Sequence, residues 1–261
     1  MIEAWLDLPT LGIFAVLTAA YAAIAAAIVW LCFGRPAGPA LRRFEGVVAP
    51  FFGAVSVLFA LLTGFLASDV GDRNRQAARA VQTEAGELRN VFALSVASAA
   101  DMRAIRAAWT AYVKAIMADD WPAMENGEGA ASVDNAYEAL LREVSDPKIA
   151  AEAGTAVHNA LINATVRAGT ARSDRLALAA DRTNDIKWQI VLILGVMTQI
   201  AVAVVHLQKR NPQIAALAVF TVAMVIALGL IAIQERPFAG EVRIGAAPLQ
   251  ELLKQHAANG T

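Results

Sequence analysis

The sequence predicts an all-α integral membrane protein, and three observations lead to that fold class. Hydrophobic residues make up 57% of the 261, and the mean hydropathy is +0.50, which is too apolar for an ordinary soluble domain. Four uncharged apolar runs are each long enough to cross a bilayer, which takes about 20 residues. The long segment between the second and third runs is rich in helix-forming residues and has almost no β signal.

The first predicted span is Thr10–Phe33, with Trp5 before it and Trp30 near its end, where interfacial aromatic residues are expected. A short basic loop follows, and the second span is predicted at Val47–Ala67. From there the apolar run passes into charged residues without a strong turn signal. We therefore expect this helix to leave the lipid and continue into water.

The third and fourth predicted spans are Trp188–Leu207 and Gln213–Ile233. In the segment between the second and third spans, apolar residues recur at helical spacing and predict one long helix over Asp72–Ala118. A second long helix is expected over Pro147–Ile186, beginning at the capping residue Asp146 and running directly into the third span. The second and third membrane helices would thus be extended into a long soluble helical hairpin.

The predicted chain has four parts. Residues 1–67 hold the first two membrane helices and the loop between them, and residues 68–187 form the soluble helical body, with a small insert at 119–146. Residues 188–233 hold the last two membrane helices, and residues 234–261 form a tail.

Membrane orientation is left open, because Lys and Arg mark the cytoplasmic side and two ways of counting them disagree. The short loops carry five basic residues, which favours placing those loops inside: Arg35, Arg42, Arg43, Lys209 and Arg210. The membrane ends of the body and the tail carry nine, which favours the reverse: Arg73, Arg75, Arg79, Arg172, Arg175, Arg182, Lys187, Arg236 and Arg243.

The second apolar helix ends in Gly64-Phe65, and Asp72-Arg73 and Ala78-Arg79 follow. This order resembles the bestrophin pattern, in which a pore helix ends in Gly-Phe and runs on into a charged Ala-Arg segment. Asn74 and Gln76 stand where bestrophins place aromatic residues. The acidic calcium clasp of animal bestrophins has no counterpart, so calcium gating is not implied.

The chain more closely resembles the bacterial bestrophin-like family of uncharacterised membrane proteins, and the likeness covers nearly its whole length. The residues that carry it are Ala78-Arg79, Glu84-Ala85, Leu88, Trp121-Pro122, Arg236-Pro237-Phe238, Gly240 and Pro248-Leu249. Known bestrophins are pentameric ion channels with a cytoplasmic helical body. The resemblance therefore implies a homo-oligomeric, multi-pass protein of the bacterial inner membrane with its body in the cytoplasm.

In bestrophins, apolar side chains spaced by four on the second span form the narrow neck of the pore. The resemblance places these positions at Val57, Leu61 and Phe65. Such spacing stacks side chains along one helix face, and a ring of these faces makes an apolar constriction that gates by dewetting. The alternative is that they touch lipid or neighbouring helices. Asp69 and Asp72 are placed to sample ions at the pore mouth, with a solvated helix end as the alternative.

The motif Arg236-Pro237-Phe238 has a mechanical interpretation. Pro237 stops the fourth span, Phe238 packs back into the body, and Arg236 seeks a carboxylate or a phosphate headgroup. We hypothesise that the motif latches the tail to the long helices.

Enzyme chemistry finds little support, so no catalytic residue, metal or cofactor is expected. No metal-binding spacing or Gly-rich phosphate loop is present, and the three histidines are far apart in sequence: His158, His206 and His256. Asp119-Asp120 resembles an acidic pair, but Glu125 and Glu128 nearby indicate a charged, solvated surface. The net charge of -1, with basic residues spread along the chain, does not favour nucleic acid as a partner.

Two function classes follow. The first is an ion channel whose partners are the bilayer, further copies of the same chain and inorganic ions. The second is a non-conducting membrane scaffold or signalling protein whose helical body binds a partner. No Asp, Glu, Lys or Arg lies within the four spans, which favours a passive pore over an ion-coupled carrier. A channel requires an oligomer with a continuous axial path, whereas a scaffold tolerates a monomer or a dimer.

Overall fold

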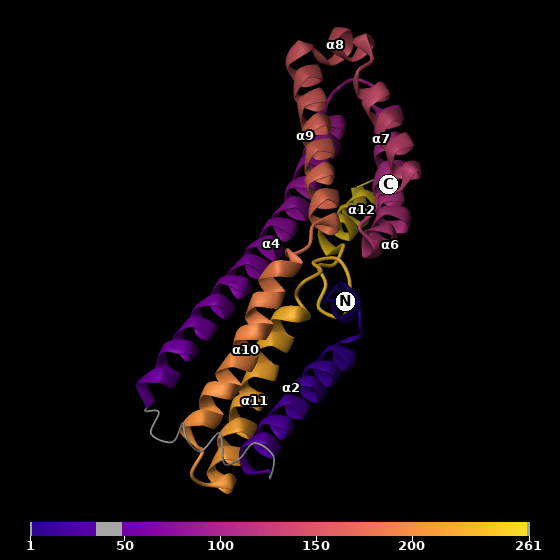
Figure 1. Cartoon of the computed structure of the whole chain (residues 1–261). Coiled ribbons are helices and arrows are strands. Elements are labelled where there is room, and N and C mark those ends of the chain that lie inside the picture. The colour runs from indigo at the N-terminus through magenta and orange to yellow at the C-terminus, as the bar shows by residue number, and fades with distance from the viewer. Residues whose placement is uncertain (1, 35–48, 260–261) are drawn as a thin grey trace. The chain divides into compact units, whose positions relative to one another are not determined.

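The computed structural model describes residues 2–34 and 49–259, and within these ranges the ordered elements are all helices (Figure 1). Arg35, Arg42 and Arg43 of the predicted basic loop lie outside these residues, as do Val47 and Val48 of the second span. The described elements are α1 (Ile2–Leu6), α2 (Thr10–Phe33), α4 (Ala49–Ala97), α5 (Arg103–Ala115), η2 (Ile116–Asp120), α6 (Trp121–Ala123), η3 (Met124–Asn126), α7 (Ala131–Val144), α8 (Pro147–Ala153), α9 (Thr155–Ala180), α10 (Asp185–Val205), α11 (Arg210–Ala232) and α12 (Ala247–Asn259).

Residue contacts divide the chain into two compact units. The membrane unit comprises Met1–Asp72 and Arg182–Glu235, and the helical body comprises Arg73–Asp181 and Arg236–Thr261. Helix α4 contributes to both units and is continuous over 49 residues, a length of about 73 Å at the usual rise per residue. The prediction that the second apolar run passes into a charged helix without a break is confirmed.

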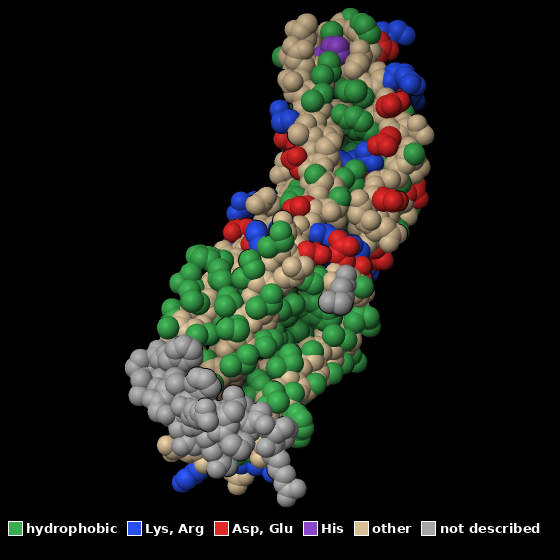
Figure 2. Space-filling model, viewed as in Figure 1, with side chains coloured by type: hydrophobic (Ala, Val, Ile, Leu, Met, Phe, Trp, Pro, Cys, Tyr) green, Lys and Arg blue, Asp and Glu red, His purple; other side chains and the backbone are tan. Residues whose placement is uncertain are grey.

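Among the residues that the structure describes, the membrane unit holds four helices that are long and apolar enough to cross a bilayer, in agreement with the four predicted spans. They are α2, α4, α10 and α11. The helix α2 has the predicted bounds, and the ends of α10 and α11 differ from the predicted spans by one to three residues. In Figure 2, hydrophobic side chains cover most of the visible face of this unit.

The helices of the membrane unit pack through aromatic and small residues. The rings of Trp5 and Trp188 meet edge to face, with centroids 5.4 Å apart. A Cβ atom at Gly229 would lie 2.3 Å from Cε1 of Phe14, so α11 approaches α2 closely only because this residue is glycine. Small residues at such crossings let membrane helices pack through van der Waals contact.

The helical body has its own apolar core. Trp109 and Tyr112 of α5 are buried there with Leu88, Leu140 and Leu161. The indole Nε1–H of Trp109 donates to the Leu88 carbonyl oxygen at 2.9 Å, which satisfies its one polar group inside the core. The amphipathic periodicity predicted for this segment is therefore the periodicity of a soluble helical core.

The prediction of one helix over Asp72–Ala118 is wrong at one point, because α4 ends at Ala97 and α5 begins at Arg103. Two side chains in the break bond to the backbone. The Ser98 hydroxyl accepts from the Ala100 N–H at 3.2 Å, and the Asp101 carboxylate accepts from the Arg103 N–H at 3.1 Å. Such local bonds compete with the helical ladder and end it.

The prediction of one helix over Pro147–Ile186, running into the third span, is also wrong. Its start is confirmed, since the Asp146 carboxylate accepts from the Lys148 N–H at 2.9 Å. The chain then turns at Gly154, whose φ of +86° suits glycine, and residues 181–184 are not helical. The Asn184 side chain accepts from the Ile186 N–H at 2.8 Å, so the third span begins as a newly capped helix.

Candidate functional site

The predicted constriction residues lie on one outward-facing stripe of α4 in the membrane unit. Val57, Leu61 and Phe65 are 61%, 51% and 62% exposed in the single chain. Another face of the same helix carries Leu66 and Val70, which are buried in the core of this unit. The stripe therefore takes little part in packing within the chain, and its apolar side chains are available to lipid, to a pore or to another copy.

The predicted pore-mouth residue Asp69 has a cationic partner. Its carboxylate lies 2.7 Å from the Lys187 ammonium of α10, and both side chains are about half exposed. Asp69, Lys187 and Phe65 line one hollow of about 320 Å³. The Asp72 carboxylate accepts from the Ser68 hydroxyl at 3.5 Å. The structure thus brings Phe65 and Asp69 together, and Lys187 offsets the Asp69 charge.

The tail motif lies within the helical body. Phe238 is 2% exposed and packs against Ala77 and Val81 of α4 and against Met124. Its ring meets Trp121 edge to face, with centroids 6.0 Å apart. These contacts join the residues after the fourth span to α4 and to the short helices around Trp121.

Two arginines of the tail contact the same residue of the body. The Arg236 guanidinium donates to the backbone carbonyl of Glu125, and Arg243 forms an ion pair with the Glu125 carboxylate. The Ile244 N–H donates to the Pro237 carbonyl at 2.8 Å, which folds the tail back on itself. Arg236 thus contacts the body through the Glu125 backbone, and a carboxylate or a phosphate headgroup as its partner stays a prediction.

The most strongly polar feature of the body is a buried network of charges that the sequence analysis missed. Glu84 of α4, Asp120 of η2 and Arg175 of α9 are all fully buried. The Arg175 guanidinium binds Glu84 in a bidentate manner, at 2.7 and 3.2 Å, and also reaches Asp120 at 3.1 Å. It stacks over Trp121 at 5.1 Å from the ring centroid. One arginine thus holds three helical segments together.

A second arginine completes the network. Arg172 is one helical turn before Arg175 on α9, and it binds Asp120 through two contacts of 2.7 and 3.0 Å. Asp120 also accepts from the Ala130 N–H at 2.9 Å. The network is therefore well satisfied by hydrogen bonds, which a buried charge requires.

The pKa values of the two buried carboxyl groups are shifted in opposite directions. Burial raises the pKa of Glu84, and the Asp120 charge adds to this, while Arg175 opposes it. Burial also acts to raise the pKa of Asp120, but bonds from Arg172 and Ala130 and the charge of Arg175 hold it below its ordinary value. Glu84 is therefore the first of the pair to take up a proton as the pH falls.

These positions correct the predicted role of Asp119-Asp120 as a solvated pair. Asp119 is exposed, but Asp120 is fully buried because π-helix η2 turns it inward toward Arg172 and Arg175. The chain also stays helical through η2, α6 and η3 beyond the predicted break at Asp119. The sequence holds one signal of the network, the pairing of Arg172 with Arg175 at a spacing of three, which places both on one helix face.

Glu235 is a third buried carboxylate that the sequence analysis missed, and it belongs to the membrane unit. It is 1% exposed. It accepts from the Thr183 N–H at 2.7 Å and from the Trp188 Nε1–H at 3.3 Å. It therefore ties the end of the fourth span to the start of the third.

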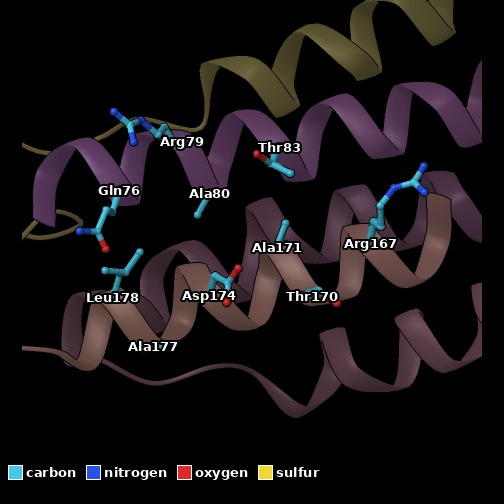
Figure 3. A pocket seen from close by; sticks show the side chains of 10 residues that line it. All are labelled: Gln76, Arg79, Ala80, Thr83, Arg167, Thr170, Ala171, Asp174, Ala177 and Leu178. Atoms are coloured by element: carbon cyan, nitrogen blue, oxygen red, sulfur yellow. The ribbon is translucent and has the colours of Figure 1, made fainter. Parts of the chain in front are cut away.

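A groove of about 580 Å³ runs between α4 and α9 in the helical body (Figure 3). Ala80 and Ala171 line it with small side chains, Arg79 and Arg167 bring positive charge, and Asp174 brings negative charge. Arg167 also pairs with Glu87 at 2.8 Å. The groove is therefore mainly apolar and carries charges of both signs. The described residues hold no group of three or more His, Cys, Asp or Glu that could hold a metal ion.

Four apolar spans and a helical body with a buried charge network define a multi-span helical membrane protein. The model of the bestrophin-like domain family matches residues 19–249. The chain belongs to this family, which confirms the resemblance drawn from its motifs. No match was found among curated proteins.

Solved structures share the fold. A bacterial bestrophin homologue from Klebsiella pneumoniae matches with a TM-score of 0.67 and 10% identity, over 94% of this chain and 97% of that chain. A variant of that homologue matches at 0.69 and 11% identity, over 98% and 100%. A structure described as a membrane protein matches at 0.72 and 10% identity, over 94% and 97%. At such identities the likeness concerns the fold alone.

Proposed function

We propose that this protein is an oligomeric ion channel that conducts passively through a pore lined by α4. The observation that carries the proposal is the exposed stripe of Val57, Leu61 and Phe65, in a chain that belongs to the bestrophin-like family. Large apolar side chains that take no part in packing within the chain are suited to a ring built from several copies. By resemblance to the bestrophins the ring has five members.

Such a ring acts as a gate through its lack of polar groups. Water leaves a narrow apolar constriction, and ions then cross only when it widens. The four spans carry no Asp, Glu, Lys or Arg at their centres, in keeping with passive conduction rather than ion-coupled transport. At the mouth, Asp69 and Asp72 are placed to sample ions, and Lys187 offsets the charge of Asp69.

The tail motif stabilises this assembly as a latch. Phe238 inserts among α4 and the short helices, and Arg236 and Arg243 hold Glu125. We propose that the protein lies in the bacterial inner membrane with its body in the cytoplasm. This orientation follows the resemblance and the nine basic residues near the body, against the five of the short loops.

The test is current across a planar bilayer that contains the purified protein. Leu61→Ala and Phe65→Ala should raise the conductance, because a wider ring retains water more easily. Leu230→Ala is the matched control: Leu230 lies on α11 and is 48% exposed, against 51% for Leu61, so it should leave the conductance unchanged. An unchanged conductance in both α4 variants would remove the stripe from the pore. Silence from folded, oligomeric protein would favour the scaffold function instead.

A further inference from the structure

An apolar groove of about 540 Å³ lies between α2 and α11 on the surface of the membrane unit. Its middle is lined by small side chains, among them Ala22, Ala25 and Ala218. One end is different in character: Trp30 of α2 and Arg210 of α11 lie there, and both are exposed. The groove is therefore apolar along its length and cationic at one end.

The length of the groove matches one leaflet of a bilayer. On α11 its lining extends from Arg210 to Val222, and on α2 from Trp30 back to Thr18. The two ends of each stretch are 12 positions apart, or about 18 Å along the helix. Half of the ~30 Å hydrocarbon core is about 15 Å. A groove that begins at the membrane surface thus reaches approximately to the midplane.

The two end residues indicate which side of the groove meets the headgroups. Arg210 begins α11 directly after the short loop, and Trp30 lies close to the end of α2. Aromatic residues concentrate at the level of the headgroups, and an arginine there can bind a phosphate oxygen through two N–H groups. The alanines leave room for a flexible acyl chain along the groove.

We propose that this groove is a binding site for an anionic phospholipid. One acyl chain lies along the alanines between α2 and α11, and Arg210 binds the phosphate at the membrane surface. The site lies on α2 and α11 and shares no residue with the α4 stripe, so its test does not require conduction.

The test uses quenching of tryptophan fluorescence by lipids with brominated acyl chains. Full-length protein is placed in vesicles of phosphatidylglycerol and phosphatidylcholine, in which one lipid or the other carries the bromine. The difference between wild type and Trp30→Phe isolates the signal of Trp30. Brominated phosphatidylglycerol should quench Trp30 as if bound about fivefold more strongly than phosphatidylcholine, the ratio expected for one interfacial basic residue.

Two pairs of variants separate a site from a general attraction. Arg210→Gln should bring the lipid ratio close to one, whereas Lys209→Gln removes the same charge next to the groove and should preserve most of it. Ala22→Phe fills the groove and should abolish the preference, whereas Ala23→Phe, on an exposed residue outside the lining, should not. Circular dichroism and gel filtration check that each variant is folded and assembled.

Three outcomes would overturn the proposal. Absence of quenching of Trp30 by either lipid would mean that another copy of the chain covers this face. Equal quenching by both lipids would mean that no anionic headgroup is selected. Equal losses in Arg210→Gln and Lys209→Gln would assign the preference to surface charge rather than to a site.

Discussion

The membrane unit and the helical body differ in the side chains that they leave exposed. Large apolar residues stand on the surface of the membrane unit, such as Val219 at 72% and Phe65 at 62% exposure, whereas the body hides Trp109 and Tyr112 almost completely. Lipid solvates apolar groups as well as a protein core does, so the membrane unit gains little by hiding them. The body faces water and must bury them.

The two regions also differ in the polar groups that they bury. Within the spans, buried polar residues such as Gln199 and Thr198 are neutral, whereas the body buries the ionisable groups of Glu84, Asp120 and Arg175. A buried ion is tolerated when its partners and hydrogen bonds are complete. The charge network is therefore the part of the body where loss of a single group is expected to matter most.

The largest expected effect comes from Arg175→Met. It leaves Glu84 and Asp120 buried with one cation fewer, which should lower the free energy of unfolding by roughly 3–5 kcal/mol. The measurement is urea unfolding of the full-length protein in detergent, followed by near-ultraviolet circular dichroism. Arg167→Met is the matched control, since Arg167 pairs with Glu87 at the surface, and it should shift the midpoint little. Equal shifts of the urea midpoint in the two variants would show that the buried network contributes no more to stability than the surface ion pair.

The next effect tests the tail latch. Phe238→Ala removes a ring that is 2% exposed among Ala77, Val81 and Met124, and should cost about 3 kcal/mol. Val242→Ala, in the same tail but 51% exposed, should stay within about 0.5 kcal/mol. Arg236→Ala should lower the thermal midpoint less than Phe238→Ala. If neither Arg236→Ala nor Phe238→Ala changed thermal stability or assembly, the latch would be abandoned.

A pair of leucines sharpens the comparison between the units directly. Leu161 in the body is fully buried and Leu61 on α4 is 51% exposed. Leu161→Ala should lower the free energy of unfolding by at least about 2 kcal/mol. Leu61→Ala should cost less than about 1 kcal/mol while changing conductance. A large loss of stability in Leu61→Ala would mean that this residue packs against another copy rather than lining a pore.

The sequence predicted the structure correctly where composition, helical periodicity or a short motif determines it. Four apolar runs sufficed for the spans, and the Ala-Arg and Arg-Pro-Phe motifs sufficed for the family. It failed where a single side chain decides the backbone path, as Asp101 does after α4 and Asn184 does before α10. These residues also occur inside helices, so their capping role depends on local geometry that no pattern contains.

The charge network was beyond prediction for a different reason. Its partners are far apart in sequence: Glu84 and Arg175 are 91 positions apart, and Asp120 is 55 positions from Arg175. In sequence, Asp120 resembled its neighbour Asp119, yet only one of them is buried. The difference arises from the turn of η2, which sequence periodicity did not reveal. Pairings of this kind depend on tertiary packing.

The smallest expected effect is the pH dependence of Glu84. Its folded-state pKa is raised above the ordinary value by burial, so its contribution to stability is complete below the ordinary pKa of a glutamate. That contribution is lost as the pH rises through the raised folded value. Glu84→Gln cannot titrate, and the stability of wild type relative to this variant should therefore fall as the pH rises through that window.

Asp120→Asn supplies the opposite slope, because the depressed pKa of Asp120 adds stability that is lost as the pH falls below the ordinary value of an aspartate. Urea midpoints measured from pH 3 to pH 8 for the three proteins compare the slopes. Parallel curves would show that the pKa values of Glu84 and Asp120 are not shifted in opposite directions, and that Arg175 stabilises the two carboxylates equally.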